Sequence, residues 1–377
     1  MAFPLRTLSR SRTGTGPLPR WRGVLAAGAV ALVHSLASGQ APTLDRAILG
    51  ASSPLNAAQT ASVKQFVSRW MSDLTGSSDP SEVTAARNAL TDPARDPSAT
   101  PVFRRSYSGV VLAELGPVVE GKDLRRAING LQVARFLRSP ESVDLIAGRL
   151  APGTETNAAK RLAAASTLAA AVLDADLSPV QCDAITRTIA AAGRSETDDQ
   201  VLLQEMKVLN GITRRSNLPA TSADAAQAAQ VTLFTGIVQG VAASPAATPR
   251  MASVARALVS LRNQWLELAR PQATKLGPTL APAIATVLET ADRHWETAKN
   301  DPNAGPSYEI AVATGETLLR LIDRTMRPNA YPAPKPGAKD DDARVLATSW
   351  TNGAKDAFGS EVARWSGIMK SAPYNAK

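Results

Sequence analysis

Cysteine and histidine are scarce in this chain of 377 residues, which contains one cysteine and two histidines. Cys182 therefore has no internal disulfide partner, and its place in an apolar helical pattern predicts a small buried thiol. A Ser-His-Asp arrangement would have to use His294, because His34 lies in the basic N-terminal segment. We expect His294 at the surface or at a helix end. No metal site, no cofactor and no catalytic residue set is predicted.

Aromatic residues make up only 4% of the chain, and no long stretch alternates apolar and polar residues in the manner of a strand. Without a strand, a glycine-rich nucleotide-binding loop has no place. Alanine, valine and leucine are abundant instead, and alanine favours helices that pack closely. The predicted fold class is all-α, an irregular helical repeat array followed by a bundle of long helices.

Acidic residues are outnumbered, since 33 Asp and Glu against 42 Lys and Arg give a net charge of +9. Residues 1–39 hold five arginines and no acidic residue, so the rest of the chain carries only +4. That remainder has no dense block of Lys and Arg, which nucleic-acid binding needs. We therefore expect no nucleic-acid partner.

Residues 1–39 have the pattern of a secretory signal peptide. An apolar run of eleven residues, Gly23–Val33, follows the basic region, and Ala37 and Gly39 fit a cleavage site. A membrane span needs roughly 20 apolar residues, so no stable span is expected after cleavage. The chain is predicted to be exported to the periplasm or cell envelope. The alternative is a mitochondrial transit peptide, because residues 1–22 are rich in Arg, Ser and Thr.

A repeat follows the leader. Three segments place apolar or small residues three, six and ten positions after a proline: Pro80-Val83-Ala86-Leu90, Pro140-Val143-Ile146-Leu150 and Pro179-Cys182-Ile185-Ile189. Proline suits the first turn of a helix, and the later positions share one helix face. A second helical stretch is expected after each segment, and a loop over Thr91–Pro101 is expected to lengthen the first interval.

The stretch RRAINGLQVARFLRSPESVDLIAGRL, with the KRLAAASTL that comes after it, resembles HEAT-type α-helical repeats. The matching positions are Ser139, Pro140, Val143 and Leu150 in the turn and its helix, and Lys160, Arg161, Ala164, Ala165 and Leu168 in the next. The resemblance covers about residues 78–210, with proline spacings of 60 and 39 that depart from a regular period. It implies stacked helices with an extended surface, and a structural role for motif arginines such as Arg161.

The chain then divides by pattern. We predict a HEAT-like repeat region over 40–215, a helical bundle over 220–327, a proline-rich linker over 328–342 and a C-terminal helix over 343–377. The 343–370 segment is expected to dock on the bundle, to meet a partner or to mediate self-association.

A polar stripe on one predicted helix is the candidate binding site. Arg125, Asn129, Gln132 and Phe136 lie roughly opposite the Ala/Leu face of that helix. They predict contacts with a protein partner, and the alternative for the arginines is hydrogen bonding within and between repeats. Two functions stay open. One is an exported, non-catalytic scaffold for protein–protein interaction. The other is an envelope glycan-cleaving enzyme with a dispersed carboxylate site in an α-helical toroid.

Overall fold

The computed structural model describes residues 43–330 and 344–375, and every regular element in these ranges is a helix. The all-α fold class is therefore confirmed. The predicted signal peptide and residues 331–342 of the predicted linker lie outside the described residues. No described helix combines the length and the hydropathy that a bilayer crossing requires.

The helices are short to medium in length. They are α1 (Arg46–Leu49), α2 (Ala57–Gly76), α3 (Pro80–Arg95), α4 (Pro101–Glu120), α5 (Leu124–Leu137), α6 (Pro140–Ala147), α7 (Ala158–Asp174), α8 (Pro179–Ala192), α9 (Asp199–Thr213), α10 (Ala220–Ala242), α11 (Met251–Glu267), α12 (Arg270–Arg293), α13 (Trp295–Asn300), α14 (Gly305–Met326), α15 (Val345–Asn352) and α16 (Lys355–Met369), with a 3-10 helix at Pro328–Ala330.

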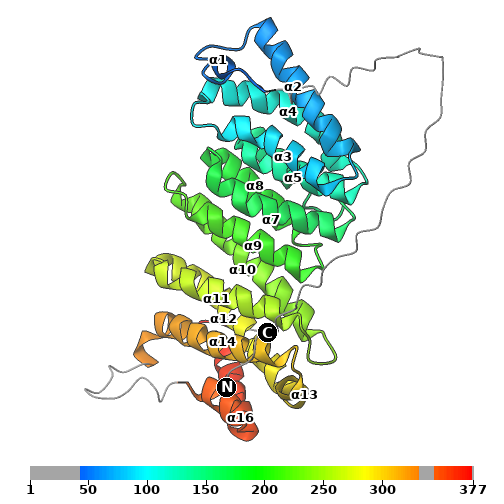
Figure 1. The fold of residues 1–377 in the computed structure, drawn as a ribbon. Coiled ribbons are helices and arrows are strands. Elements are labelled where there is room, and N and C mark those ends of the chain that lie inside the picture. The colour runs from blue at the N-terminus through cyan, green and yellow to red at the C-terminus, as the bar shows by residue number, and fades with distance from the viewer. Residues whose placement is uncertain (1–42, 331–343, 376–377) are drawn as a thin grey trace, which may run out of the picture. The chain divides into compact units, whose positions relative to one another are not determined.

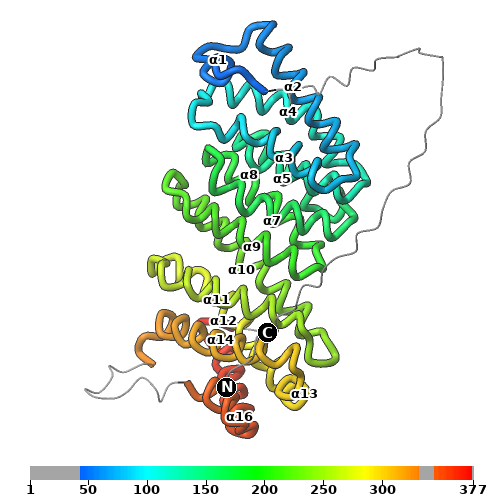
Figure 2. Tube along the Cα trace, viewed as in Figure 1, coloured from blue at the N-terminus to red at the C-terminus, as the bar shows by residue number. Residues whose placement is uncertain are grey.

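The helices pack in two layers that run in chain order (Figures 1 and 2). In one layer α3, α5, α7, α9, α11 and α14 each pack against the next. In the other, α2, α4, α6, α8, α10, α12 and α16 do the same. One continuous apolar core, rich in Ala, Val and Leu, fills the space between the layers. The small side chains let neighbouring helices approach closely, as the composition predicts.

Proline marks the start of three helices in the repeat region. Pro80, Pro140 and Pro179 each stand in the first turn, after the N-caps Asp79, Ser139 and Ser178. The missing proline N–H costs nothing there, because the first N–H groups of a helix have no partner within it. The residues three, six and ten positions after each proline are all buried. The shared offsets therefore identify the inward face correctly.

The expected loop over Thr91–Pro101 is wrong in its first half. Helix α3 continues through Pro93 to Arg95, and α4 starts at Pro101. Thr91 and Ala94 are buried, so packing holds this last turn in place despite the proline. The long first interval is filled by two whole helices, α4 and α5, rather than by a loop.

The C-terminal segment forms two helices rather than one. Gly353, with a φ of 72°, caps α15 in the left-handed region that glycine adopts without strain. Helix α15 packs on α14, and α16 packs on α12. Trp350 and Phe358 join Trp295 in an aromatic cluster, with ring centroids 4.7 and 5.0 Å from that of Trp295. The apolar faces of α15 and α16 are thus covered by the chain itself.

Candidate functional site

A polar groove opens across three consecutive helices of one layer, α3, α5 and α7. Its volume is about 440 Å³, within the range of small-ligand sites. We call it the basic groove, and its lining residues are Arg87, Asn88, Thr91, Arg95, Gln132, Arg135, Phe136, Ser166 and Thr167. Three of the nine are arginines and none is acidic.

The three guanidinium groups are held in two different ways. Arg87 Nη1 donates to Gln132 Oε1 at 2.7 Å, which joins α3 to α5. The guanidinium carbons of Arg95 and Arg135 lie over the ring of Phe136, at 5.1 and 5.0 Å from its centroid. Such cation–π contacts hold cations against an aromatic face without neutralising them. The groove therefore concentrates positive charge, and contacts with Gln132 and Phe136 hold the charged groups in place.

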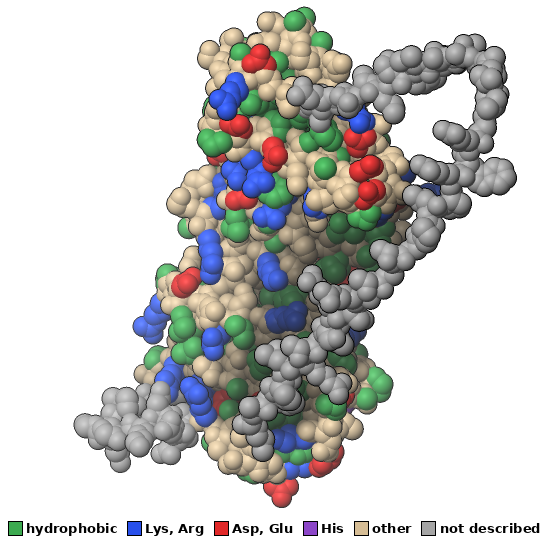
Figure 3. All heavy atoms as spheres, viewed as in Figure 1, with side chains coloured by type: hydrophobic (Ala, Val, Ile, Leu, Met, Phe, Trp, Pro, Cys, Tyr) green, Lys and Arg blue, Asp and Glu red, His purple; other side chains and the backbone are tan. Residues whose placement is uncertain are grey.

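Within the described residues, none of these arginines forms an ion pair. The Nε atom of Arg135 is also buried and has no hydrogen-bond partner. A buried donor without a partner costs free energy, and three cations in one groove repel one another. An anion bound in the groove would relieve the repulsion between the cations. Figure 3 shows that Lys and Arg side chains also recur along the face in view.

The four residues predicted for partner binding divide into two pairs. Gln132 and Phe136 line the basic groove. Asn129 and Arg125 lie about one and two turns before Gln132 on α5 and do not line the groove, although Asn129 Oδ1 accepts from Arg87 Nη1 at 3.4 Å. Arg125 donates to the carbonyl of Ser78 at 3.3 Å, and Asn129 Nδ2 donates to the carbonyl of Arg125 at 2.9 Å. One end of the stripe thus lines the groove, and the other end is hydrogen-bonded to the connection between α2 and α3.

Sequence reasoning missed the three arginines that give the groove its charge. Arg95 fell in the segment expected to be a loop, although it ends α3. Arg87 reaches the groove only because α3 packs against α5. Arg135 stands next to Phe136 in the chain, and that arginine–aromatic pair was the one local signal available.

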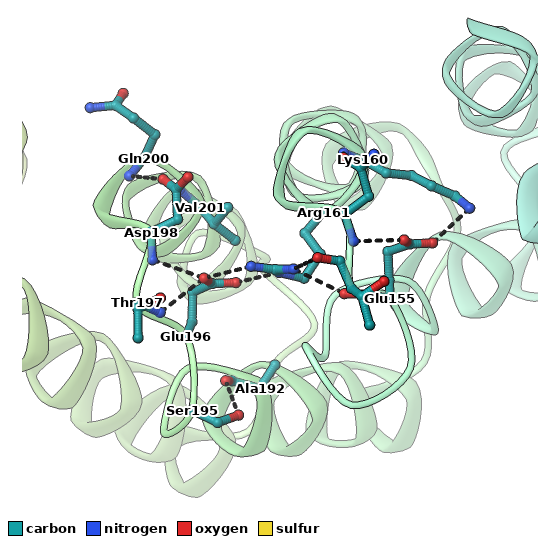
Figure 4. A network of polar contacts seen from close by, with 12 residues as sticks. Glu155, Lys160, Arg161, Ala192, Ser195, Glu196, Thr197, Asp198, Gln200 and Val201 are labelled. Atoms are coloured by element: carbon teal, nitrogen blue, oxygen red, sulfur yellow. Dashed lines mark hydrogen bonds and ion pairs between the residues drawn. The ribbon is translucent and has the colours of Figure 1, made fainter. Parts of the chain in front are cut away.

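A second polar network lies at the starts of α7 and α9 (Figure 4). Arg161 donates through Nε and Nη2 to the two carboxylate oxygens of Glu196, at 2.6 and 3.0 Å. Its Nη1 donates to the carbonyls of Glu155 and Thr156. Burial alone would raise the pKa of Glu196, but the hydrogen bonds from Arg161 and from the backbone lower it overall. All of these contacts are internal, so Arg161 has the structural role that the repeat resemblance implies.

Glu205, on α9, is a buried carboxyl without a partner. It is fully shielded from solvent, and neither of its carboxylate oxygens accepts a hydrogen bond. Burial raises its pKa to about 8, and the charge of Glu196 adds to the shift while Arg161 opposes it. The group is therefore protonated at neutral pH in the folded chain. It faces the core between α8 and α10 rather than the basic groove.

The groups considered for chemistry lie apart from one another. His294 sits at the junction of α12 and α13, so of the two expected positions, at the surface or at a helix end, it has the second, and it is buried there. Burial lowers its pKa. Cys182 is buried, as predicted. Within residues 43–330 and 344–375, no three His, Cys, Asp or Glu residues gather as they would around a metal ion.

Two carboxylates line a pocket of about 310 Å³ beside Trp350, namely Asp301 and Glu309. Asp301 Oδ1 accepts the backbone N–H groups of Asn303 and Ala304, so it fixes the turn before α14. Lys299 shares the pocket and donates to the Trp350 carbonyl at 2.7 Å. These contacts give Asp301 and Lys299 structural roles, and nothing in the pocket favours the glycan-cleaving alternative.

Comparison of the chain with protein-family models and with curated proteins gives no match. The function must therefore be argued from the fold and from the basic groove.

Proposed function

We propose that this chain is an exported, non-catalytic helical scaffold that binds a protein partner through the basic groove. The observation that carries the proposal is the set of three arginines that line one groove with Phe136, two of them over its ring, without an ion-pair partner in the described part of the chain. An array of stacked helices supports this role, because each helix adds to one continuous surface. Arginine and aromatic side chains are also the residues that most often dominate binding energy at protein interfaces.

The site lies on a rigid support, which favours recognition over a moving catalytic loop. Arg87, Gln132 and Phe136 all lie on helices, and the Arg87–Gln132 hydrogen bond spans two of them. Binding to preformed helices loses little free energy to ordering of the surface. The leader pattern of residues 1–39 supports export to the periplasm or cell envelope, where the partner would also be found.

The test is a quantitative pull-down from an envelope fraction with the tagged full chain. We compare wild type with the groove variant Gln132→Ala/Phe136→Ala and with a control variant, Val180→Ala/Arg187→Ala, in the other layer. Val180 and Arg187 are exposed on α8, so the control removes one apolar and one polar side chain from outside the groove. We expect one protein to be recovered in stoichiometric amount by wild type and control and to be lost with the groove variant.

Recovery of the same proteins by all three chains would overturn the proposal, as would reproducible recovery of none. Circular dichroism and thermal unfolding of each chain establish that the variants are folded. Hydrolysis of purified envelope glycans by the wild-type chain would replace the scaffold with the enzyme.

A further inference from the structure

We propose that the ligand of the basic groove is an extended acidic segment of the partner, with carboxylates on Arg95 and Arg135 and the adjacent chain lying along Phe136. This inference rests on the proposed function and names the chemistry of the same site. It begins from the fact that Arg95 and Arg135 come from different helices, α3 and α5, yet both lie over one aromatic ring. The ring fixes two cations as neighbours at the groove.

The charge of the groove lining decides which charge its ligand must carry. The lining contains three guanidinium groups and no carboxylate, and none of the three has an ion pair within the described ranges. Elsewhere in the described residues Lys160, Arg161 and Arg250 each contact a carboxylate within 2.8 Å. A guanidinium presents forked N–H donors that match a carboxylate.

The groove favours a polypeptide over a nucleic acid. Two guanidinium groups already lie over Phe136, which makes the ring a support for cations rather than a platform on which a base could stack. The uncharged polar lining groups include Asn88, Ser166 and Thr167, which offer an amide and hydroxyls to the N–H and C=O groups of an extended chain. The absence of a dense basic block in the sequence points the same way.

The experiment is direct binding of defined peptides to the purified full chain, followed by fluorescence anisotropy at low and at physiological salt. The probe is a labelled ten-residue peptide rich in Asp and Glu with a central Leu. Its matched control replaces each Asp with Asn and each Glu with Gln. We expect only the acidic peptide to bind, with an affinity that falls as salt is raised, because salt screens the attraction.

Three variants assign the binding to the groove. Arg95→Gln/Arg135→Gln should lower the affinity for the acidic peptide by about tenfold or more. Each substitution removes a charge-assisted hydrogen bond between an arginine and a carboxylate of the peptide. The control Arg187→Gln/Arg194→Gln removes the same net charge from exposed positions at α8 and should change the affinity less than about twofold. Arg95→Lys/Arg135→Lys keeps the charge but loses the planar fork, and it should fall between the two.

Equal binding of the neutral peptide, or equal weakening by the two Gln double variants, would overturn the inference. So would stronger competition by an oligonucleotide or by inorganic pyrophosphate than by the unlabelled peptide. If the acidic peptide fails but the pull-down still depends on Gln132 and Phe136, the scaffold proposal stands and only its ligand chemistry is wrong. If both fail, the groove is not the binding site.

Discussion

Arg161 and Glu196 form a two-point ion pair inside the helix stack, with the Glu196 side chain fully buried and that of Arg161 only 7% exposed. Glu196 also accepts the N–H groups of Thr197 and Asp198, just before α9. The pair therefore joins the first turn of α7 to the segment that leads into α9. Each charge is tolerated in the interior because the other is there.

Breaking this pair should destabilise the protein strongly. Glu196→Gln leaves the Arg161 charge buried without a counter-ion, which costs about 3–5 kcal/mol. Replacing both with methionine should cost less than the sum of the single changes, because no buried charge remains. Urea unfolding measures the free energies. The surface pair Arg69–Asp73 supplies the control, and Arg69→Gln should cost less than about 1 kcal/mol. A Glu196→Gln effect as small as that of Arg69→Gln would contradict the prediction.

Glu205 should make stability fall as pH rises. Its folded-state pKa of about 8 lies above the ordinary value of 4.5, so the folded chain holds this proton more tightly than the unfolded chain. Stability is then lost as pH rises from about 5 to about 8, by an amount on the order of 3 kcal/mol. Glu205→Gln, which carries no titratable proton, should flatten this slope and be more stable than wild type at pH 8.

Chemical unfolding at several pH values between 5 and 8 tests this prediction. Glu267→Gln, an exposed acid at the end of α11, is the matched control and should leave the slope unchanged. A slope that is the same in the Glu205→Gln variant and in wild type would show that Glu205 is not its source.

Much of the local structure could be predicted from the sequence, because it depends on neighbours in the chain. Helices start at Pro80, Pro140 and Pro179 because of local chain geometry, whatever packs around them. The residues three, six and ten positions after each proline form the buried face. Glu205 was also visible in principle, since it occupies an inward position between Val201 and Val208 on the stripe of α9. A carboxyl on an apolar stripe is a sign of a buried acid.

Other features depend on packing between helices, and the neighbouring residues in the sequence do not indicate them. Pro93 ordinarily ends a helix, but the burial of Ala94 and the hydrogen bonds from Arg104 to the carbonyls of Ala94 and Asp96 support α3 to its end at Arg95. The basic groove requires α3 to lie beside α5, which no spacing in the sequence gives. His294 likewise has the pattern of an exposed helix end, and the surrounding helices bury it.

Two glycines should respond in opposite ways to the same substitution. A Cβ at Gly305 would lie 2.7 Å from the carbonyl oxygen of Ala298, and backbone cannot swing aside as a side chain can. Gly305→Ala should therefore destabilise the protein by about 1–3 kcal/mol. Gly367 in α16 is exposed and has nothing within 4 Å of the same position, so Gly367→Ala should stabilise by up to about 1 kcal/mol. Thermal unfolding shows the two signs, and a stabilising Gly305→Ala would refute the first.

Glu316 should hold α15 in place. Its carboxylate is buried and accepts the N–H groups of Leu346 and Ala347, at 3.1 and 2.8 Å, in the first turn of that helix. Glu316→Ala removes both acceptors and the ion pair to Arg320, so amide hydrogen exchange should accelerate across α15. Exchange in α5 and α7 should not change.

Glu309→Ala, at an exposed position of the same helix α14, is the control for this measurement. Unaltered exchange at Leu346 and Ala347 in the Glu316→Ala variant would show that the aromatic contacts around Trp350 alone retain the helix.

The order of the two layers has a consequence for how the molecule forms. The main helix–helix contacts join α-helices that are at most four α-helices apart along the chain, so most contacting residues are synthesised close together in time. Such low contact order favours rapid folding. The basic groove, made by α3, α5 and α7, can be complete while the C-terminal helices are still being synthesised. The helices that line the groove can thus pack vectorially, from the first helices onward.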